Sequence, residues 1–114
     1  MTKHSDEKYF DDMLVHARKA VALVGDRDRN SFQSDEALRY GVTHLIQIVG
    51  EAASRISPDA RATADEFPWA DIINMRHRLV HDYGNIDDGI VWDTAIRDLP
   101  RVIAALETRR KPRA

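Results

Sequence analysis

The chain has 114 residues, of which 43% are hydrophobic and 32% are charged, and its formal net charge is −2. This length and apolar content predict one domain, residues 1–114, built on a single hydrophobic core. The absence of cysteine excludes disulfides and thiolate metal sites, and it favours a reducing, cytoplasmic location. The balance of charges argues against an extended basic surface for nucleic acid, but it leaves room for a focused basic cleft.

The two ends of the chain are polar. The first seven residues, MTKHSDE, contain no apolar run, and no stretch of the chain approaches the roughly 18 apolar residues that a membrane span needs. We therefore expect no signal peptide and no membrane segment. Residues 1–4 and the basic tail 109–114 are predicted to be flexible ends.

The first predicted helix runs from Ser5 to Val24, with Ser5 as its cap and Gly25 as its stop. The polar run 26–30 predicts a loop. Apolar residues recur in this segment at the spacing of one helix face: Phe10, Met13, Leu14, Ala17, Val21 and Val24.

A second helix is predicted to open at 34–36 and to end at Ser57 and Pro58. Its apolar residues recur about every 3.5 positions, which favours lengthwise packing in a bundle. They are Leu38, Val42, Leu45, Val49, Ala52 and Ile56.

Two further helices complete the predicted bundle. After a connector at 59–67, Pro68 is typical of the first position of a helix, which runs to Tyr83 and ends at Gly84. A fourth helix opens at Asp87, and Pro100 inside it should kink or interrupt it. With no alternation typical of strands, the expected fold is an all-α antiparallel bundle of four to five helices.

The third helix carries the pattern R-x4-H-x-Y, formed by Arg76, His81 and Tyr83. At about 100° per residue, Arg76 and Tyr83 share one face with Ile72, Leu79 and Val80. Burial of an unpaired arginine is strongly unfavourable. We therefore expect this stripe to face a partner surface, a polar cleft or an anion.

Arginine and histidine at this spacing suit RNA cleavage without a metal ion. The His81 imidazole would exchange protons with the ribose 2′-hydroxyl and the leaving 5′-oxygen, and Arg76 would stabilise the charged phosphate. On spacing alone, the pattern also fits an ordinary pair of surface side chains.

The neighbouring polar residues allow other readings. His77 and His81 form an H-x3-H pair that suits a metal, but neither H-E-x-x-H nor E-x-x-H occurs, and we expect no metal and no cofactor. Glu51 lies on the flank of the second helix with His44 and Arg55. It would either orient Arg76 or His81 or form an ion pair with Arg55.

Several landmarks in this order resemble the HepT-like branch of the HEPN superfamily, the toxin halves of modules with a minimal nucleotidyltransferase. They are Gly50-Glu51-Ala52, Trp69, the run from Arg76 to Tyr83, Ile90-Val91-Trp92 and Asp98-Leu99-Pro100. The resemblance covers most of the chain from the second helix onward. One departure is His77, where this branch usually carries asparagine.

The resemblance implies a homodimer in which the R-x4-H helices of both subunits line one cleft. It implies an RNA substrate, catalytic roles for Arg76 and His81, and support from His77 or Glu51. It also implies a toxin-antitoxin system in which a nucleotidyltransferase antitoxin adds AMP to Tyr83. Two other classes remain open: a non-catalytic nucleotide-binding or regulatory partner of a nucleotidyltransferase, and a structural dimerisation module.

Overall fold

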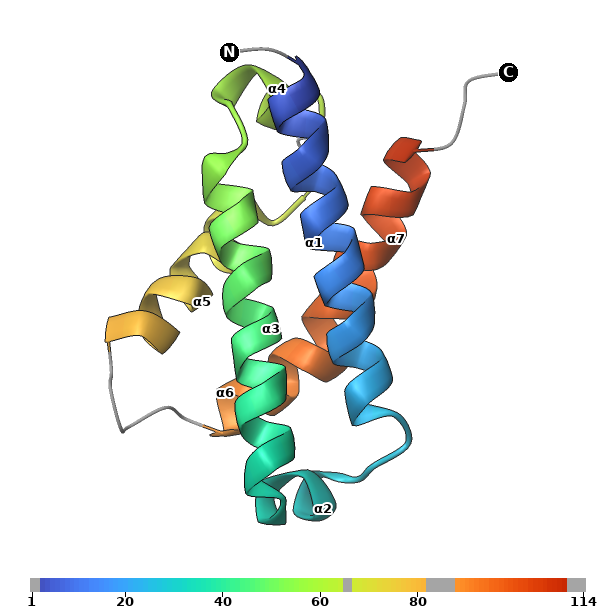
Figure 1. Cartoon of the computed structure of the whole chain (residues 1–114), viewed down its shortest axis with the longest axis vertical. Coiled ribbons are helices and arrows are strands. Elements are labelled where there is room, and N and C mark those ends of the chain that lie inside the picture. The colour runs from blue at the N-terminus through green and yellow to red at the C-terminus, as the bar shows by residue number, and fades with distance from the viewer. Residues whose placement is uncertain (1–2, 65–66, 82–87, 111–114) are drawn as a thin grey trace.

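The computed structural model describes residues 3–64, 67–81 and 88–110, and all regular structure in these ranges is helical (Figure 1). This confirms the predicted all-α fold. The elements in chain order are α1 (Lys3–Val24), α2 (Arg29–Ser34), α3 (Glu36–Arg55), α4 (Pro58–Ala62), α5 (Trp69–His81), α6 (Asp88–Asp93), the π-helical segment η1 (Thr94–Asp98) and α7 (Leu99–Arg110).

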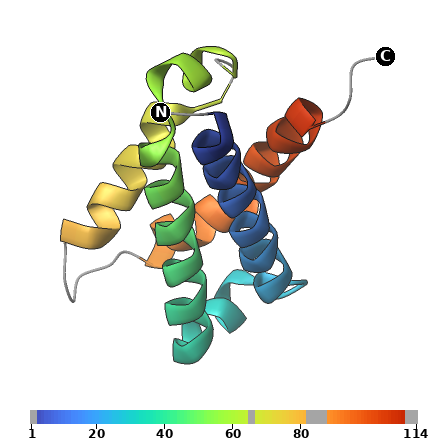
Figure 2. The ribbon, with the colours of Figure 1, turned by 45° about the horizontal axis from the view of Figure 1, so that its top comes forward.

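Helices α1 and α3 lie side by side and antiparallel at the centre of the molecule (Figures 1 and 2). Helix α7 packs on α1, and α5 packs on the side of α3 that faces away from α1. None of the described helices is long and apolar enough to cross a membrane.

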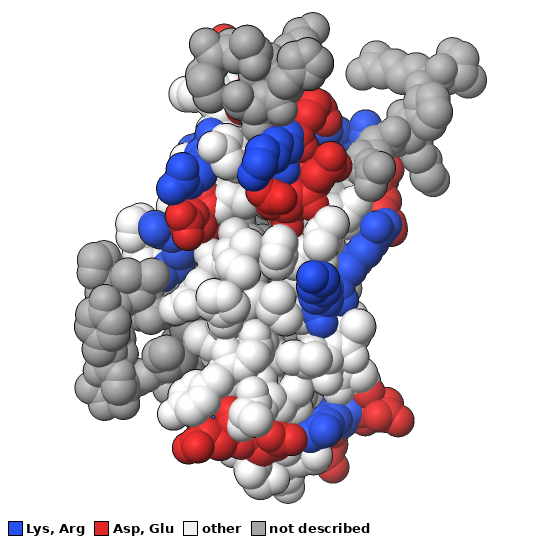
Figure 3. Space-filling model, in the orientation of Figure 1, with Lys and Arg blue, Asp and Glu red and all other residues white. Residues whose placement is uncertain are grey.

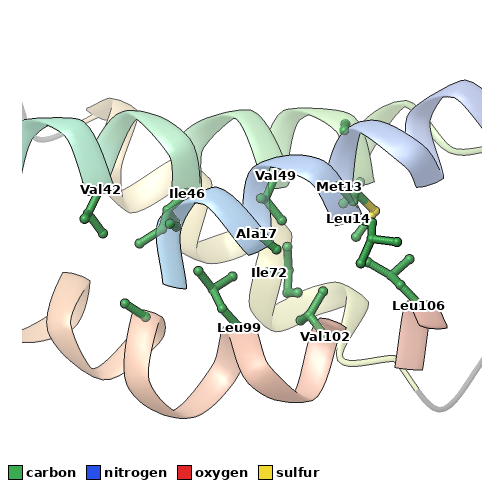
Figure 4. Packing of buried hydrophobic residues seen from close by; sticks show 14 of the residues in the cluster. Met13, Leu14, Ala17, Val42, Ile46, Val49, Ile72, Leu99, Val102 and Leu106 are labelled. Carbon is green, nitrogen blue, oxygen red and sulfur yellow. The ribbon is translucent and has the colours of Figure 1, made fainter. Parts of the chain in front are cut away.

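The hydrophobic core lies where α1, α3, α5 and α7 meet (Figure 4). Each of these helices contributes apolar side chains, so the core joins segments from both ends of the chain. The side chains at its centre are Met13, Leu14, Ala17, Val42, Ile46, Val49, Ile72, Leu99, Val102 and Leu106.

The first connection differs from the prediction in two ways. Helix α1 already begins at Lys3, so Ser5 lies inside it and is not its cap. Gly25 ends the helix as predicted, with φ at +58°. The polar loop is shorter than expected because Arg29–Ser34 forms α2, capped by the side chain of Asp28.

Helix α2 is held in place by one aromatic residue, Phe32, which lies in an otherwise polar stretch of sequence. Phe32 is fully buried, and its ring centroid lies 5.3 Å from that of Trp92 in α6. The Asp28 carboxylate accepts a 2.8 Å hydrogen bond from the Ser31 backbone N–H, which stabilises the first turn. Tertiary packing and a cap therefore suffice for a helix without apolar periodicity.

The predicted interruption at Pro100 takes the form of a π-helical turn. The Leu99 N–H bonds to the carbonyl of Thr94, five residues earlier. Pro100 has no N–H, and its ring would crowd the carbonyl of Ile96 in a regular α-helix. The wider turn accommodates the ring and divides the predicted fourth helix into α6, η1 and α7.

Asp6 in α1 connects the beginning of the chain to the start of α4. Its carboxylate accepts a 3.0 Å hydrogen bond from the Ser57 backbone N–H and a 2.8 Å hydrogen bond from the Ser57 hydroxyl. These bonds favour the charged carboxylate and hold the pKa of Asp6 below its usual value of 3.8.

We therefore expect Asp6→Asn to unfold at a lower urea concentration than the unmodified protein at neutral pH. A lowered pKa contributes stability that is full above pH 3.8 and is lost as the pH falls through the folded-state value. The two urea midpoints should converge in acid. Asp11→Asn, at an exposed position of the same helix, should change little, and a gap for Asp6→Asn that is constant with pH would contradict this account.

Candidate functional site

The R-x4-H segment lies in the C-terminal half of α5. Among the predicted site residues, the structure describes the side chains of Arg76, His77 and Glu51. The backbone of His81 forms the last residue of α5, and its side chain is outside the described part. Tyr83 also lies outside the described residues.

Helices α3 and α5 are in close contact at Gly50. A Cβ atom at this position would lie only 2.5 Å from the Cβ of Arg76, and 3.3 Å from the carbonyl oxygen of Ile72. Real Cβ atoms essentially never come within 3.0 Å of another heavy atom. Helix α5 can therefore approach α3 this closely only because residue 50 has no side chain.

This crossing corrects the expected orientation of the apolar stripe. Ile72 is 5% exposed and packs in the core of its own chain, so of the three surroundings expected for the stripe, the partner surface is wrong for Ile72. Helical periodicity locates an apolar face but does not distinguish packing within the bundle from packing on another subunit. The side chains of Leu79 and Val80 lie outside the described part.

Arg76 is half-buried, and α3 covers the inner part of its side chain: Gly50 lies directly opposite its Cβ and Cγ atoms. Among the side chains that the structure describes, no carboxylate forms an ion pair with Arg76; the ion pairs present involve other cations. The guanidinium is thus not neutralised by any described acidic group. Such a group is suited to bind an anion such as phosphate.

The start of α5 is fixed by Trp69. Its indole N–H donates a 2.9 Å hydrogen bond to the carbonyl of Ala64. Its ring packs edge-on against Phe10 of α1 at a centroid distance of 6.0 Å, and against Phe67 at 5.1 Å. These contacts explain why a tryptophan stands at the first residue of this helix.

Arg61 links the end of α3 to the start of α5, a role that the sequence analysis missed. It donates hydrogen bonds to the last carbonyls of α3, and its guanidinium carbon lies 5.7 Å from the centroid of the Trp69 ring. A basic residue shortly after a helix end is a recognisable signal for such a cap. The carbonyl partners are those of Ala53, Ser54 and Ile56.

Glu51 and His77 are both exposed, on different helices. The Glu51 carboxylate forms a 3.0 Å ion pair with Arg55, which is one of the two roles left open by the sequence. Together with Tyr9 it lines an open groove of about 260 Å³ between α1 and α3. Within one chain, Glu51 therefore faces α1, whereas its neighbour Gly50 faces α5.

The cleft beside the start of α5 is too small for a nucleotide. It lies between α3, α5 and η1 and has about 30 Å³ of space, enough for a few water molecules. This small cleft is therefore not a nucleotide site, whereas Arg76 offers a local positive charge on α5.

In the described ranges, no three histidine, aspartate or glutamate side chains gather as a metal site would require. Figure 3 shows charged side chains of both signs near the two ends of the face in view, and a middle that is largely uncharged except for basic side chains at its right-hand side.

Comparison with known proteins matches the family described as "Ribonuclease HepT-like" over residues 13–109. The chain is 29% identical to "Putative RNase MJ1380" of Methanocaldococcus jannaschii over 107 residues, which cover 94% of this chain and 98% of the relative. It is 28% identical to "Probable ribonuclease HepT" of Thermococcus cleftensis, with 96% of this chain and 99% of the relative covered. No solved structure gives a significant match.

The matched residues extend from α1 to α7 and include both Gly50 and the R-x4-H segment on α5. The all-α architecture agrees with the fold expected from the sequence. The chain therefore belongs to the HepT-like ribonuclease family of the HEPN superfamily.

Proposed function

We propose that this protein is a metal-independent endoribonuclease and the toxin of a toxin-antitoxin system. The observation that carries this proposal is Arg76, whose stem is packed against α3 while no described carboxylate neutralises its guanidinium. Membership of a ribonuclease family supports RNA as the substrate. A fixed cation of this kind suits a phosphate that gains charge in the transition state.

In the proposed reaction, the ribose 2′-oxygen attacks the adjacent phosphorus and the bond to the 5′-oxygen breaks. A neutral His81 imidazole accepts the proton of the 2′-hydroxyl, and a protonated imidazole donates a proton to the leaving 5′-oxygen. Two copies of His81 in a dimer cleft supply both forms. The products are a 2′,3′-cyclic phosphate and a free 5′-hydroxyl, and His77 or Glu51 supports the reacting groups.

Replacing either proposed catalytic residue should abolish most RNA cleavage. Arg76→Ala and His81→Ala should each lower the cleavage rate on the order of 10²-fold or more, with helicity unchanged, because each removes charge stabilisation or proton transfer. Arg18→Ala is a suitable control, since Arg18 lies on α1 and pairs with Glu107. The assay is cleavage of RNA in EDTA with identification of the new ends.

Two outcomes would contradict this assignment. Loss of cleavage in EDTA with recovery on added zinc or magnesium would favour a metal held by His77 and His81. A wild-type protein that never cleaves RNA but binds nucleotide would favour the non-catalytic regulatory class.

The proposed dimer places the two copies of α5 along one cleft. Helix α5 packs mainly on α3, and its C-terminal end lies at the outer edge of the molecule in both views (Figures 1 and 2). An edge helix of this kind leaves its outer side available to a second copy. Pairing there would bring two copies of Arg76 together. This would concentrate positive charge locally, although the net charge of the chain is −2.

Sedimentation should give about twice the chain mass of 13.0 kDa. Leu79→Glu, on α5, should dissociate the dimer and abolish cleavage, because a carboxylate in an apolar interface is strongly unfavourable. Tyr40→Glu is the matched control: Tyr40 is 63% exposed on α3, and this variant should stay dimeric. A wild-type monomer at micromolar concentration would exclude the shared cleft.

Tyr83 is proposed as the site at which a nucleotidyltransferase antitoxin adds AMP. It stands two residues after the end of α5 and seven after Arg76. An AMP group on the tyrosine would bring phosphate charge towards Arg76 and compete with the RNA phosphate. Activity would then fall without a change of fold.

Incubation with the proposed nucleotidyltransferase antitoxin and ATP should add AMP to Tyr83 and inhibit cleavage. Intact-mass measurement and peptide mapping identify the modified residue, and Tyr83→Phe should remain unmodified and active. If the partner inhibits Tyr83→Phe as strongly as the unmodified protein, inhibition is by occlusion and this proposal fails.

A further inference from the structure

We propose that Gly50 is the positioning residue for Arg76. Because Gly50 has no side chain, α5 can pack directly on α3 at Arg76, the residue proposed to bind the scissile phosphate. This contact determines where the guanidinium lies. The catalytic importance of this placement rests on the proposed ribonuclease function. The geometric part, that position 50 is coupled to position 76, stands by itself.

The contact is made by parts of α5 that cannot move aside independently. A Cβ at position 50 would lie 2.5 Å from Cβ and 3.2 Å from Cγ of Arg76, and 3.3 Å from the carbonyl oxygen of Ile72. Ile72 and Arg76 are one helical turn apart, so the two contacts belong to the helix crossing itself. A Cβ atom has no rotamer through which it can avoid the clash.

The other glycine of α3 provides a contrast. A Cβ at Gly41 would lie 3.2 Å from Cδ2 of Leu23, and Leu23 is 46% exposed. The end of this exposed side chain can rotate away at small free-energy cost. Both glycines lie in the same helix, but only Gly50 lies opposite a proposed catalytic side chain.

An added methyl group at position 50 should displace Arg76 more than the beginning of α5. Carbon atoms in contact prefer separations of about 3.5–4.0 Å, so relief of the clash needs a movement of about 1 Å. Trp69 holds the first turn of α5 through its bond to Ala64 and its packing on Phe10. The displacement therefore falls on the part of α5 that contains Arg76. A misplacement of about 1 Å can lower a reaction rate on the order of 10²-fold.

The experiment compares Gly50→Ala with Gly41→Ala in the full-length protein. Both changes exchange glycine for alanine within α3, so they bring the same gain in helix propensity. We expect Gly41→Ala to cleave RNA within about twofold of the wild-type kcat. Gly50→Ala should keep its oligomeric mass and helicity but lose kcat by about 10-fold or more, with a smaller change in KM. Wild-type kcat in Gly50→Ala would overturn the proposal.

A double-mutant cycle shows whether the effect passes through Arg76. In an Arg76→Ala background, Gly50→Ala should cause no further loss of cleavage, because the guanidinium that it displaces is already absent. If the two losses instead multiply, Gly50 acts through His81 or through the fold as a whole, and the proposal is wrong.

Thermal unfolding tests the geometry without any reference to RNA. Gly50→Ala should lower the melting temperature much less in an Arg76→Gly background, where the opposing Cβ is missing, than in the wild-type background. Equal losses in both backgrounds would overturn the positioning role even if Gly50→Ala folds too poorly for kinetics. If the wild-type protein does not cleave RNA but this thermal coupling is present, the proposed function fails while the packing of position 50 against position 76 stands.

Discussion

The close approach of α5 to α3 at Gly50 is the constraint on which the geometry of the R-x4-H helix depends. The missing side chain brings the Cβ of Arg76 against the backbone of α3, and it places Ile72 in the core beside Val49. A larger residue at position 50 would push the part of α5 that contains Arg76 away from α3. The same glycine thus serves core packing on one turn of α5 and the candidate site on the next.

Other contacts make this crossing rigid from both sides of the candidate site. Arg61 joins the last carbonyls of α3 to the Trp69 ring, so one side chain contacts both the end of α3 and the start of α5. Asp88, the first residue of α6, forms a 3.1 Å ion pair with Arg39 of α3. The chain therefore leaves α3 for α5 and returns to α3 at α6.

The landmarks behind the family resemblance have physical roles that the sequence alone did not reveal. Trp69 fixes the first turn of α5, Val91 and Trp92 hold α6 on the core and on Phe32, and Pro100 follows the π-helical turn. A pattern match gives the order of such residues in the chain but not the contact that each one makes. Here these contacts hold the start of α5 on Phe10 of α1 and Phe67, and α6 on Phe32 of α2.

Much of the fold could be predicted because α1 and α3 have regular apolar stripes, and because Gly25 and Pro100 have strong local effects. Helix α2 could not be predicted, since a single phenylalanine in a polar run has no periodicity. The direction in which the α5 stripe faces could not be predicted either. Whether Ile72 faces its own bundle depends on the absence of a side chain at Gly50, more than 20 residues earlier in the chain. Such a tertiary contact cannot be seen in the local sequence pattern of α5.

Arg76 illustrates how a charged residue can occupy an apolar helix face. The sequence suggested that such an arginine faces a partner surface, a polar cleft or an anion, since burial of an unpaired charge is strongly unfavourable. The structure provides a further solution, in which α3 covers the aliphatic stem while the residue as a whole is only half-buried. A dimer is therefore not needed to explain why Arg76 is tolerated at this position. Its role in the proposed function is different: a second copy would bring a second guanidinium and a second imidazole to the same phosphate.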